Sequence, residues 1–290
     1  MTELLFGINV SPAVAPGADP VADAQQAERL GFDFVSANDH MHGPDPRSEA
    51  WTMLSWIAAA TTRIRVATRV LGVPFRHPSV VAKMAETFDR LSGGRLILGL
   101  GAGASDEEFR TLGLPVATAR DKVDGLAEAI RIIRGLWFDP SFTFQGRHYR
   151  TDAAILEPKL EGRIPIWLGT YGPRALRVTG QLADGWIPSL ELAPPEQVPA
   201  MRERIAAAAR EAGRDPDGVV GVYNLEIRVD DRLVDEPFVL WGRPNRIAER
   251  LAGFVDLGFT AFNFIPFGPD TSDQAERLAR EVVPAVRAAR

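Results

Sequence analysis

Short runs of consecutive apolar residues alternate along the chain with longer segments whose apolar positions recur every three or four residues. Apolar runs without polar alternation are typical of strands buried on both faces, whereas the longer spacing is typical of helices that cover a sheet. The predicted strands are residues 4–10, 32–37, 64–71, 96–100, 164–169, 186–187, 219–229 and 261–265. The predicted helices are residues 19–30, 49–60, 80–91, 116–137, 173–182, 196–212, 243–257 and 273–288.

Each predicted strand is followed by a helix, and this order requires right-handed crossovers between parallel strands. Eight such units in about 250 residues match a closed barrel better than an open sheet. We therefore expect an α/β protein, a TIM (β/α)8 barrel, in a single domain over residues 1–290. Residues 142–156 interrupt the order with period-two character around Gln145-Gly146, which predicts a hairpin-containing insertion after the fourth unit. The hairpin is either a lid over the site or an insertion without a functional role.

Composition removes several classes of protein. The 290 residues include no cysteine, which excludes disulfides and thiolate metal sites and fits a cytoplasmic protein. The N-terminus lacks the basic region and the long apolar region of a signal peptide. A formal net charge of -5 gives no indication of a nucleic acid or an anionic membrane as partner. No apolar run reaches the roughly 18 residues that a membrane-spanning helix needs.

The segment 93–113 combines a buried strand, a glycine-rich turn and the start of a helix. Gly99, Gly101 and Gly103 occupy every second position, where the lack of a Cβ lets the backbone turn and lets a ligand approach the main chain. Ser105 is expected to cap the helical turn that follows. The segment is either the rim of a ligand site or a tight turn without a ligand. It is not a complete GxGxxG sequence, and no acidic residue is placed to bind a ribose, so a dinucleotide fingerprint is not indicated.

Two further clusters follow predicted strands directly. Asp39 and His40 come after strand 32–37, and a histidine that titrates near neutral pH suits a cofactor contact or a proton relay. Residues 169–172 precede a helix whose free N–H groups, with Arg174 nearby, suit a phosphate. A hydrogen-bonded loop pair and a plain turn are the respective alternatives. Because the carboxyl ends of barrel strands meet at one opening, we expect these clusters and the glycine-rich turn to form one site.

Other kinds of catalytic site find little support in the sequence. No histidine spacing on a suitable element indicates a metal, and His40-Met41-His42 lacks a third ligand. No GxSxG or comparable nucleophile sequence occurs. We therefore expect no metal site, and a metal-dependent hydrolase is the least favoured function.

Several segments in a fixed order resemble one known family. They are Ala27 to Asp33 with Asp39-His40, Phe75 to Pro78 with Ala82-Lys83, Ser92 to Gly103 with Glu107-Glu108-Phe109, Gly169 to Leu176, Ala183 to Trp186, and Val282 to Pro284. Through these residues the whole chain resembles the luciferase-like monooxygenase superfamily, and more narrowly its branch of coenzyme F420-dependent oxidoreductases.

The resemblance implies a TIM barrel that binds a deazaflavin or a flavin at the carboxyl ends of its strands. It implies a ring near Asp39 and His40, over a bulged third strand with a non-proline cis peptide near Arg69-Val70, and a phosphate at residues 169–172. The implied cofactor-binding positions are Asp39, His40, Val70, Leu71, Gly72, Ala102, Gly103, Glu107, Gly169, Thr170, Tyr171 and Gly172. The catalytic candidates are Asp39 and His40, of which His40 is preferred for ring positioning or proton handling.

We therefore expect an F420-dependent oxidoreductase that transfers a hydride between the deazaflavin and a small organic substrate. An FMN-dependent monooxygenase and a catalytically silent flavin-binding barrel are the alternatives. The sugar-phosphate dehydrogenases of the family carry a tryptophan and a proton-donating glutamate where this chain has Pro44 and Ala104. They also carry a lysine for the substrate phosphate that is missing near Ser189, so glucose 6-phosphate oxidation is not favoured.

Two expectations concern partners. Relatives commonly dimerise through helices near the second and third units, so we expect a homodimer. The residues expected around the mouth of the barrel are mostly apolar and favour an uncharged small-molecule substrate; they are Met41, Trp51, Pro188 and Leu190.

Overall fold

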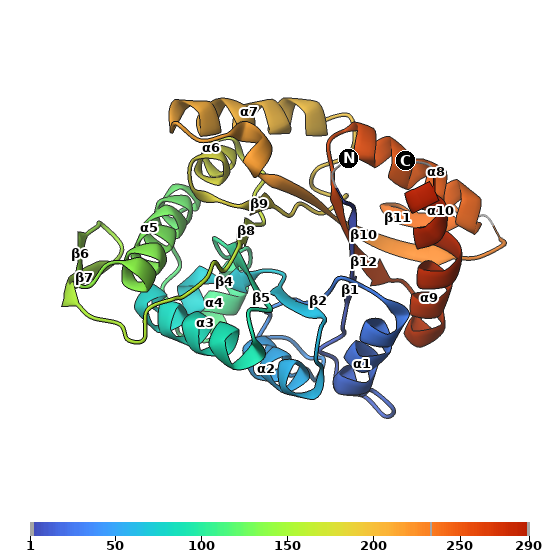
Figure 1. Cartoon of the computed structure of the whole chain (residues 1–290), viewed down its shortest axis with the longest axis horizontal. Helices are drawn as coiled ribbons and strands as arrows, with labels where there is room; N and C mark the ends of the chain where they lie inside the picture. The colour runs from blue at the N-terminus through green and yellow to red at the C-terminus, as the bar shows by residue number, and fades with distance from the viewer. Residues whose placement is uncertain (1–2, 233, 289–290) are drawn as a thin grey trace.

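Eight parallel strands close into a barrel in the computed structural model, which describes residues 3–232 and 234–288 (Figure 1). Each strand pairs with the next, and the pairing of β9 with β10 closes the ring. The strands are β1 (Leu5–Asn9), β2 (Phe34–Ala37), β3 (Arg65–Thr68), β5 (Leu96–Gly101), β8 (Ile166–Leu168), β9 (Gly185–Trp186), β10 (Val220–Val229) and β12 (Ala261–Pro266). The predicted TIM barrel is confirmed.

Helices surround the barrel, and local sequence accounts for where many of them begin (Figure 1). Several start with proline, whose fixed φ suits the first helical turn and whose missing N–H would be unpaired there in any residue. The full set of α-helices is α1 (Pro20–Leu30), α2 (Ala50–Ala60), α3 (Pro78–Ser92), α4 (Asp106–Thr111), α5 (Ala119–Phe138), α6 (Pro173–Leu182), α7 (Val198–Glu211), α8 (Pro244–Asp256), α9 (Thr271–Arg277) and α10 (Val283–Ala288). Two 3-10 turns, η1 (Val73–Phe75) and η2 (Pro216–Gly218), complete the set with a π-helical turn, η3 (Leu278–Val282).

Three features differ from the predicted order of elements. The third strand breaks after Thr68 and resumes as β4 (Leu71–Gly72), which pairs with β5. A short strand that the sequence did not predict, β11 (Val239–Gly242), pairs in parallel with the second half of β10. The predicted helix 273–288 is divided into α9, η3 and α10, because the π-helical turn inserts before Val283.

The hairpin insertion after the fourth unit is confirmed as β6 (Phe142–Gln145) and β7 (Arg150–Ala154). It lies outside the barrel, against α5 (Figure 1). The carboxylate of Glu128 on α5 accepts hydrogen bonds of 2.8, 2.8 and 2.9 Å from the N–H groups of the three residues 147–149. This anchoring favours a structural insertion over a lid.

The interior of the barrel is filled in two different layers. Phe34, Trp167 and other apolar side chains fill the part towards the amino ends of the strands. Towards the carboxyl ends lies a polar chain: Ser36 donates to Asn263 at 2.8 Å, Asn263 donates to Asn224 at 3.0 Å, and Asn224 donates to the carbonyl of Ile187 at 3.2 Å. The opening above this polar layer is the end at which a barrel accommodates a ligand.

Candidate active site

One cavity of about 340 Å³ opens where β2, β4, β5 and β8 end. Its lining brings together the three clusters that were predicted to converge, as shown by His40, Gly103 and Gly172. The predicted positions that line it are Asp39, His40, Val70, Gly72, Ala102, Gly103, Gly169, Thr170, Tyr171 and Gly172. Leu71 and Glu107 do not line it: Leu71 is fully buried, and Glu107 is exposed on α4.

Close packing around Val70 explains part of the glycine pattern. The peptide between Arg69 and Val70 is cis, at the place that the family resemblance implied. A Cβ on Gly101 would lie 2.6 Å from a methyl group of Val70, and a Cβ on Gly99 would lie 1.9 Å from the carbonyl oxygen of Thr68. These two glycines are therefore required by the packing of neighbouring strands, whatever the cavity holds.

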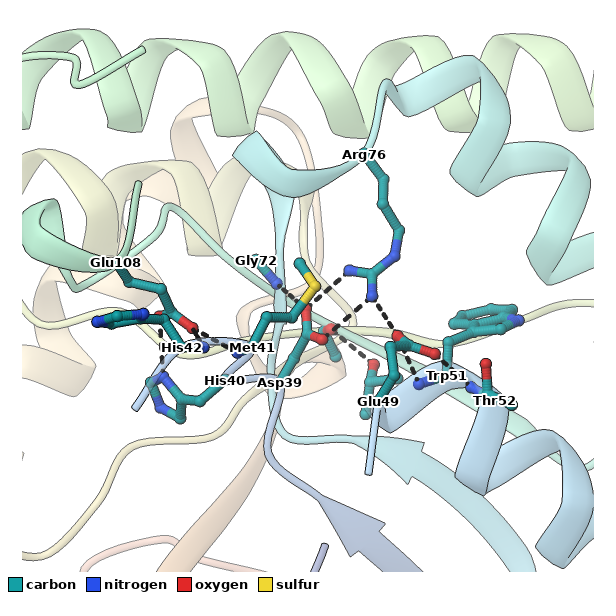
Figure 2. Close-up of polar contacts among 12 residues, drawn as sticks. Asp39, His40, Met41, His42, Glu49, Trp51, Thr52, Gly72, Arg76 and Glu108 are labelled. Carbon is teal, nitrogen blue, oxygen red and sulfur yellow. Dashed lines mark hydrogen bonds and ion pairs between the residues drawn. The ribbon is translucent and has the colours of Figure 1, made fainter. Parts of the chain in front are cut away.

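Asp39 anchors β4, the second half of the third strand, and the segment that follows it (Figure 2). Its buried carboxylate accepts hydrogen bonds from the N–H of Gly72 at 3.0 Å and from both terminal nitrogens of Arg76 at 2.8 and 3.2 Å. Arg76 also pairs with Glu49, which caps α2. Burial would lower the pKa of Arg76, but hydrogen bonds and attraction from the two carboxylates raise it. With its oxygens engaged in this way, Asp39 is suited to positioning and poorly suited to proton transfer.

His40 and Glu108 form a second polar contact at the edge of the cavity (Figure 2). His40 Nδ1 lies 3.2 Å from Glu108 Oε2, and the other oxygen of Glu108 accepts from the N–H groups of Met41 and His42. Burial would raise the pKa of Glu108, but these hydrogen bonds and the nearby imidazole hold it below its usual range. Because an ionised carboxylate only accepts, the proton lies on Nδ1 and Nε2 remains free to exchange one.

Glu108, and not the predicted Glu107, lines the cavity. Ser105 caps α4 as predicted, with its hydroxyl accepting from the N–H of Glu108 at 3.2 Å. This cap sets the phase of the helix, so Glu108 turns towards loop 40–42 and Glu107 towards solvent. A serine followed three residues later by glutamate is the pattern of a capping box, and this pattern could have singled out Glu108 in the sequence.

The turn before α6 suits a phosphate through its backbone. Gly172 caps the helix without a side-chain hydrogen bond, and a Cβ there would meet nothing within 4 Å. The first N–H groups of α6 are therefore open to an anion. The hydroxyl of Thr179 donates to the carbonyl of Ala175. The hydroxyl of Thr170, 2.7 Å away, therefore donates its own proton to the oxygen of Thr179 and has none left for a phosphate. Arg174 is paired with Asp124 and does not line the cavity.

A second cavity of about 860 Å³ adjoins the first. Arg69, Ser189 and Asn224 line both, so the two form one continuous opening. Leu190 lines this second cavity as expected. Trp51, in contrast, packs edge-on against Phe88 on the outer side of the barrel, 5.5 Å between ring centroids.

Among residues 3–232 and 234–288, no group of three histidine, aspartate or glutamate side chains is placed to hold a metal ion. No helix there is both long enough and apolar enough to cross a membrane.

The fold and the cavity define a barrel protein with a site at the carboxyl ends of its strands. Residues 6–232 match the luciferase-like monooxygenase family, and the chain belongs to that family. It is 30% identical to the F420-dependent glucose-6-phosphate dehydrogenase of Kineococcus radiotolerans, over 94% of both chains. It is 31% identical to the corresponding protein of Mycolicibacterium gilvum, over 79% of this chain and 70% of the relative.

Solved structures show the same fold at lower identity. An F420-dependent secondary alcohol dehydrogenase in complex with an F420-acetone adduct superposes with a TM-score of 0.88, at 22% identity over 98% of this chain and 99% of the other. The coenzyme F420-dependent tetrahydromethanopterin reductase of Methanopyrus kandleri gives 0.81, at 22% identity over 97% and 99%.

Proposed function

We propose that the protein is a coenzyme F420-dependent oxidoreductase that transfers a hydride between the deazaflavin and a small organic substrate. The observation that carries the proposal is the convergence of His40, Gly103 and Gly172 on one cavity at the mouth of the barrel. The names of the sequence relatives and structural neighbours support F420 as the cofactor. When bound, F420 supplies a ring carbon that accepts or donates the hydride.

The described residues fit such a cofactor along the length of the cavity. The open N-terminus of α6 would hold the phosphate, and Gly172, where a Cβ would meet nothing within 4 Å, leaves room for it. Val70, Gly72 and Gly103 would lie beside the ring. The other proposed contacts are Asp39, His40, Ala102, Thr170 and Tyr171, with Glu108 in place of Glu107. Leu71, which is fully buried, is not among them.

His40 is the proposed proton-handling residue. Glu108 orients the imidazole and keeps the proton on Nδ1, so Nε2 can accept the hydroxyl proton of an alcohol while its carbon loses a hydride. In the opposite direction, an imidazolium at this position would protonate the oxygen of a carbonyl as its carbon gains a hydride. Asp39 supports this site by fixing Gly72 and Arg76.

Glucose 6-phosphate, which gives the sequence relatives their name, is not the substrate that we propose. Ala104 lines the cavity at the position of the glutamate that sugar-phosphate dehydrogenases carry, and its methyl side chain cannot exchange a proton. Pro44 stands where those dehydrogenases carry a tryptophan, and the lysine that they carry for the substrate phosphate is missing near Ser189.

A homodimer through α2 and α3 is part of the proposal. These helices form an outer groove of about 680 Å³ whose lining includes Trp51, Val80, Phe88 and Leu91. Val80 and Leu91 are 53% and 76% exposed. A patch of this kind is typical of a surface that another protein covers, and a second copy is the occupant that we propose.

Cofactor titration tests the proposed function directly. The purified protein is mixed with F420 and, separately, with FMN, and dissociation constants are obtained from fluorescence quenching. We expect F420 to bind more tightly. Tight binding of FMN without binding of F420 would instead favour the flavin-dependent monooxygenase.

Turnover is then measured with a panel of alcohols and, using reduced F420, of carbonyl compounds and enones. His40→Asn should retain F420 binding and lose roughly 100-fold or more in turnover, because the proton acceptor is removed. A protein that binds F420 but turns over no member of the panel would favour the non-catalytic barrel.

A further inference from the structure

Arg69 lies between the two cavities and takes part in neither the Asp39–Arg76 contact nor the His40–Glu108 contact. Its backbone N–H donates to the carbonyl of Ala37 at 2.8 Å. Val70, the next residue, packs towards the glycines of β5 and towards Gly169, which follows β8. The side chain of Arg69 extends towards the end of β1, where its Nε donates to the side-chain oxygen of Asn9 at 3.1 Å. This bond fixes the plane of the guanidinium at the junction of the cofactor cavity and the larger second cavity.

The two terminal nitrogens of this guanidinium have no hydrogen-bond partner among residues 3–232 and 234–288, and no carboxylate there forms an ion pair with it. Arg76 and Arg228, the neighbouring arginines of the barrel mouth, each hold a carboxylate through both terminal nitrogens. Burial lowers the pKa of Arg69 to about 10, against weaker opposing attraction from Tyr171 and Glu226, so it stays charged at neutral pH. The guanidinium is only partly buried, so its two unpaired terminal nitrogens are open to the cavities that it lines. A fixed, charged two-pronged donor in this position is suited to receive an anion.

Asn38 lines the second cavity together with Arg69. Its side-chain oxygen is buried and has no hydrogen-bond partner among residues 3–232 and 234–288, so this atom does not face the cavity. The donor that the cavity offers to a ligand is therefore the pair of terminal nitrogens of Arg69.

The charges around the cavity limit which anion fits. Its lining includes Arg47 on the basic side and Asp45, Glu191 and Glu226 on the acidic side. These carboxylates would repel a doubly charged phosphate more strongly than a singly charged group. A carboxylate is also planar and matches the two parallel N–H groups of a guanidinium.

We propose that Arg69 binds a carboxylate of the substrate, so that the enzyme acts on a hydroxy acid or the corresponding oxo acid. This inference rests on the proposed function and names the substrate class for the same site. It replaces the expectation of an uncharged substrate, which was based on the apolar residues around the mouth. With the carboxylate on Arg69, the carbon that bears the hydroxyl would extend towards His40 and the cofactor cavity.

The test compares acids with their neutral amides by isothermal titration calorimetry, with and without saturating F420. The pairs are lactate and lactamide, mandelate and mandelamide, and 3-hydroxybutyrate and 3-hydroxybutyramide, and inorganic phosphate is a further probe. For at least one pair, wild type should bind the acid about tenfold more tightly than the amide. Arg69→Gln should abolish this preference, and Arg69→Lys should retain part of it.

Arg177→Gln is the matched control, because Arg177 pairs with Glu211 on the surface, lines neither cavity and should leave the preference unchanged. The melting temperature and the F420 titration show whether each variant is folded. If no pair shows a preference in wild type, or if the preference survives in Arg69→Gln or is lost in Arg177→Gln, the inference is wrong. Phosphate that binds more tightly than every acid also overturns it. Failure of wild type to bind F420 refutes the proposed function separately, since acid binding is measured without the cofactor as well.

Discussion

At the scale of single residues, the pair His40 and Glu108 decides how a proton moves at the site. Glu108→Gln would keep the size of the side chain but remove the carboxylate that holds the imidazole and the N–H groups of Met41 and His42. We expect the rate of F420 turnover to fall about 100-fold while the affinity for F420 changes little, because the imidazole of His40 loses its orientation and its fixed tautomer.

Glu107→Gln is the control for this prediction, because Glu107 is the exposed neighbour on the same helix. Stopped-flow measurement of F420 reduction with a substrate alcohol separates the rate of hydride transfer from cofactor binding. Equal losses in the two variants, or a loss of F420 affinity as large as the loss of rate, would contradict the assignment of Glu108 as a positioning residue.

The choice between Glu107 and Glu108 shows which sequence signal matters at this turn. Both carboxylates follow the glycine-rich turn, and composition does not distinguish them. Their distance from Ser105 does, because the phase set by this cap directs Glu108 inward. Arg69 was missed for a different reason: its neighbour Val70 was predicted from the family resemblance, but whether an arginine is paired or unpaired depends on contacts between distant strands.

At the scale of elements, the turn between β5 and α4 depends on one glycine. Gly103 has φ of +90°, and a Cβ there would lie 2.5 Å from the ring of Phe109. Gly103→Ala should therefore destabilise the fold by about 1–3 kcal/mol and weaken F420 binding, because the rim of the cavity would shift. Urea denaturation and F420 titration measure the two effects.

Gly253→Ala provides the contrast for Gly103→Ala. Gly253 lies inside α8, where a Cβ would meet nothing within 4 Å. Alanine restricts the unfolded chain at such a position, so we expect an unchanged or slightly higher free energy of unfolding. Similar losses of stability in both variants would show that the positive φ of Gly103 is not the cause.

The third helix contains a buried carboxylate that makes stability depend on pH. Burial would raise the pKa of Glu86, but hydrogen bonds from Arg90, Lys83 and Thr87 lower it below its usual value of 4.5. The unfolded state then binds the proton more readily, so this contribution is present above about pH 4.5 and is lost as the pH falls through the lower pKa of the folded protein.

Glu86→Gln should cost about 1–3 kcal/mol at neutral pH, because a charged acceptor of three hydrogen bonds is lost. The difference from wild type should shrink in acid, where wild type also loses the charge. Denaturation curves from neutral to acidic pH test both statements, with Glu276→Gln, a half-exposed partner of Arg280, as the control. A difference that stays constant over this range would contradict the mechanism.

Among the elements, those with strong periodicity were predicted and those without it were not. The helix over residues 116–137 repeats its apolar positions over many turns, and it corresponds to α5. The strand β11 has only four residues and follows a polar loop, so neither length nor alternation distinguishes it. The π-helical turn before Val283 leaves a helical pattern in the sequence on both sides, which is why one continuous helix was predicted.

For the whole molecule, the count of strand–helix units was sufficient to predict a closed barrel, because parallel strands need covered faces and right-handed crossovers. Closure in turn places His40, Gly103 and Gly172 around one opening, although they are far apart in the sequence. The second cavity was not predictable in the same way. Its shape depends on where segments from both ends of the chain, including residues 11–15 and 237–238, come to lie above the barrel.

The outer groove of α2 and α3 leads to a prediction about assembly. Both helices lie on the outside of the barrel (Figure 1). Two apolar side chains of α3, Val80 and Leu91, are exposed there. If a second copy covers this surface, Leu91→Glu places a charge in a dry interface and should convert the dimer into a monomer. Ile155→Glu is the control, because Ile155 is also exposed, at 69%, but lies after the hairpin strand β7. Light scattering on a size-exclusion column distinguishes the two states, and a wild-type monomer at micromolar concentration or a dimeric Leu91→Glu variant would rule out this interface.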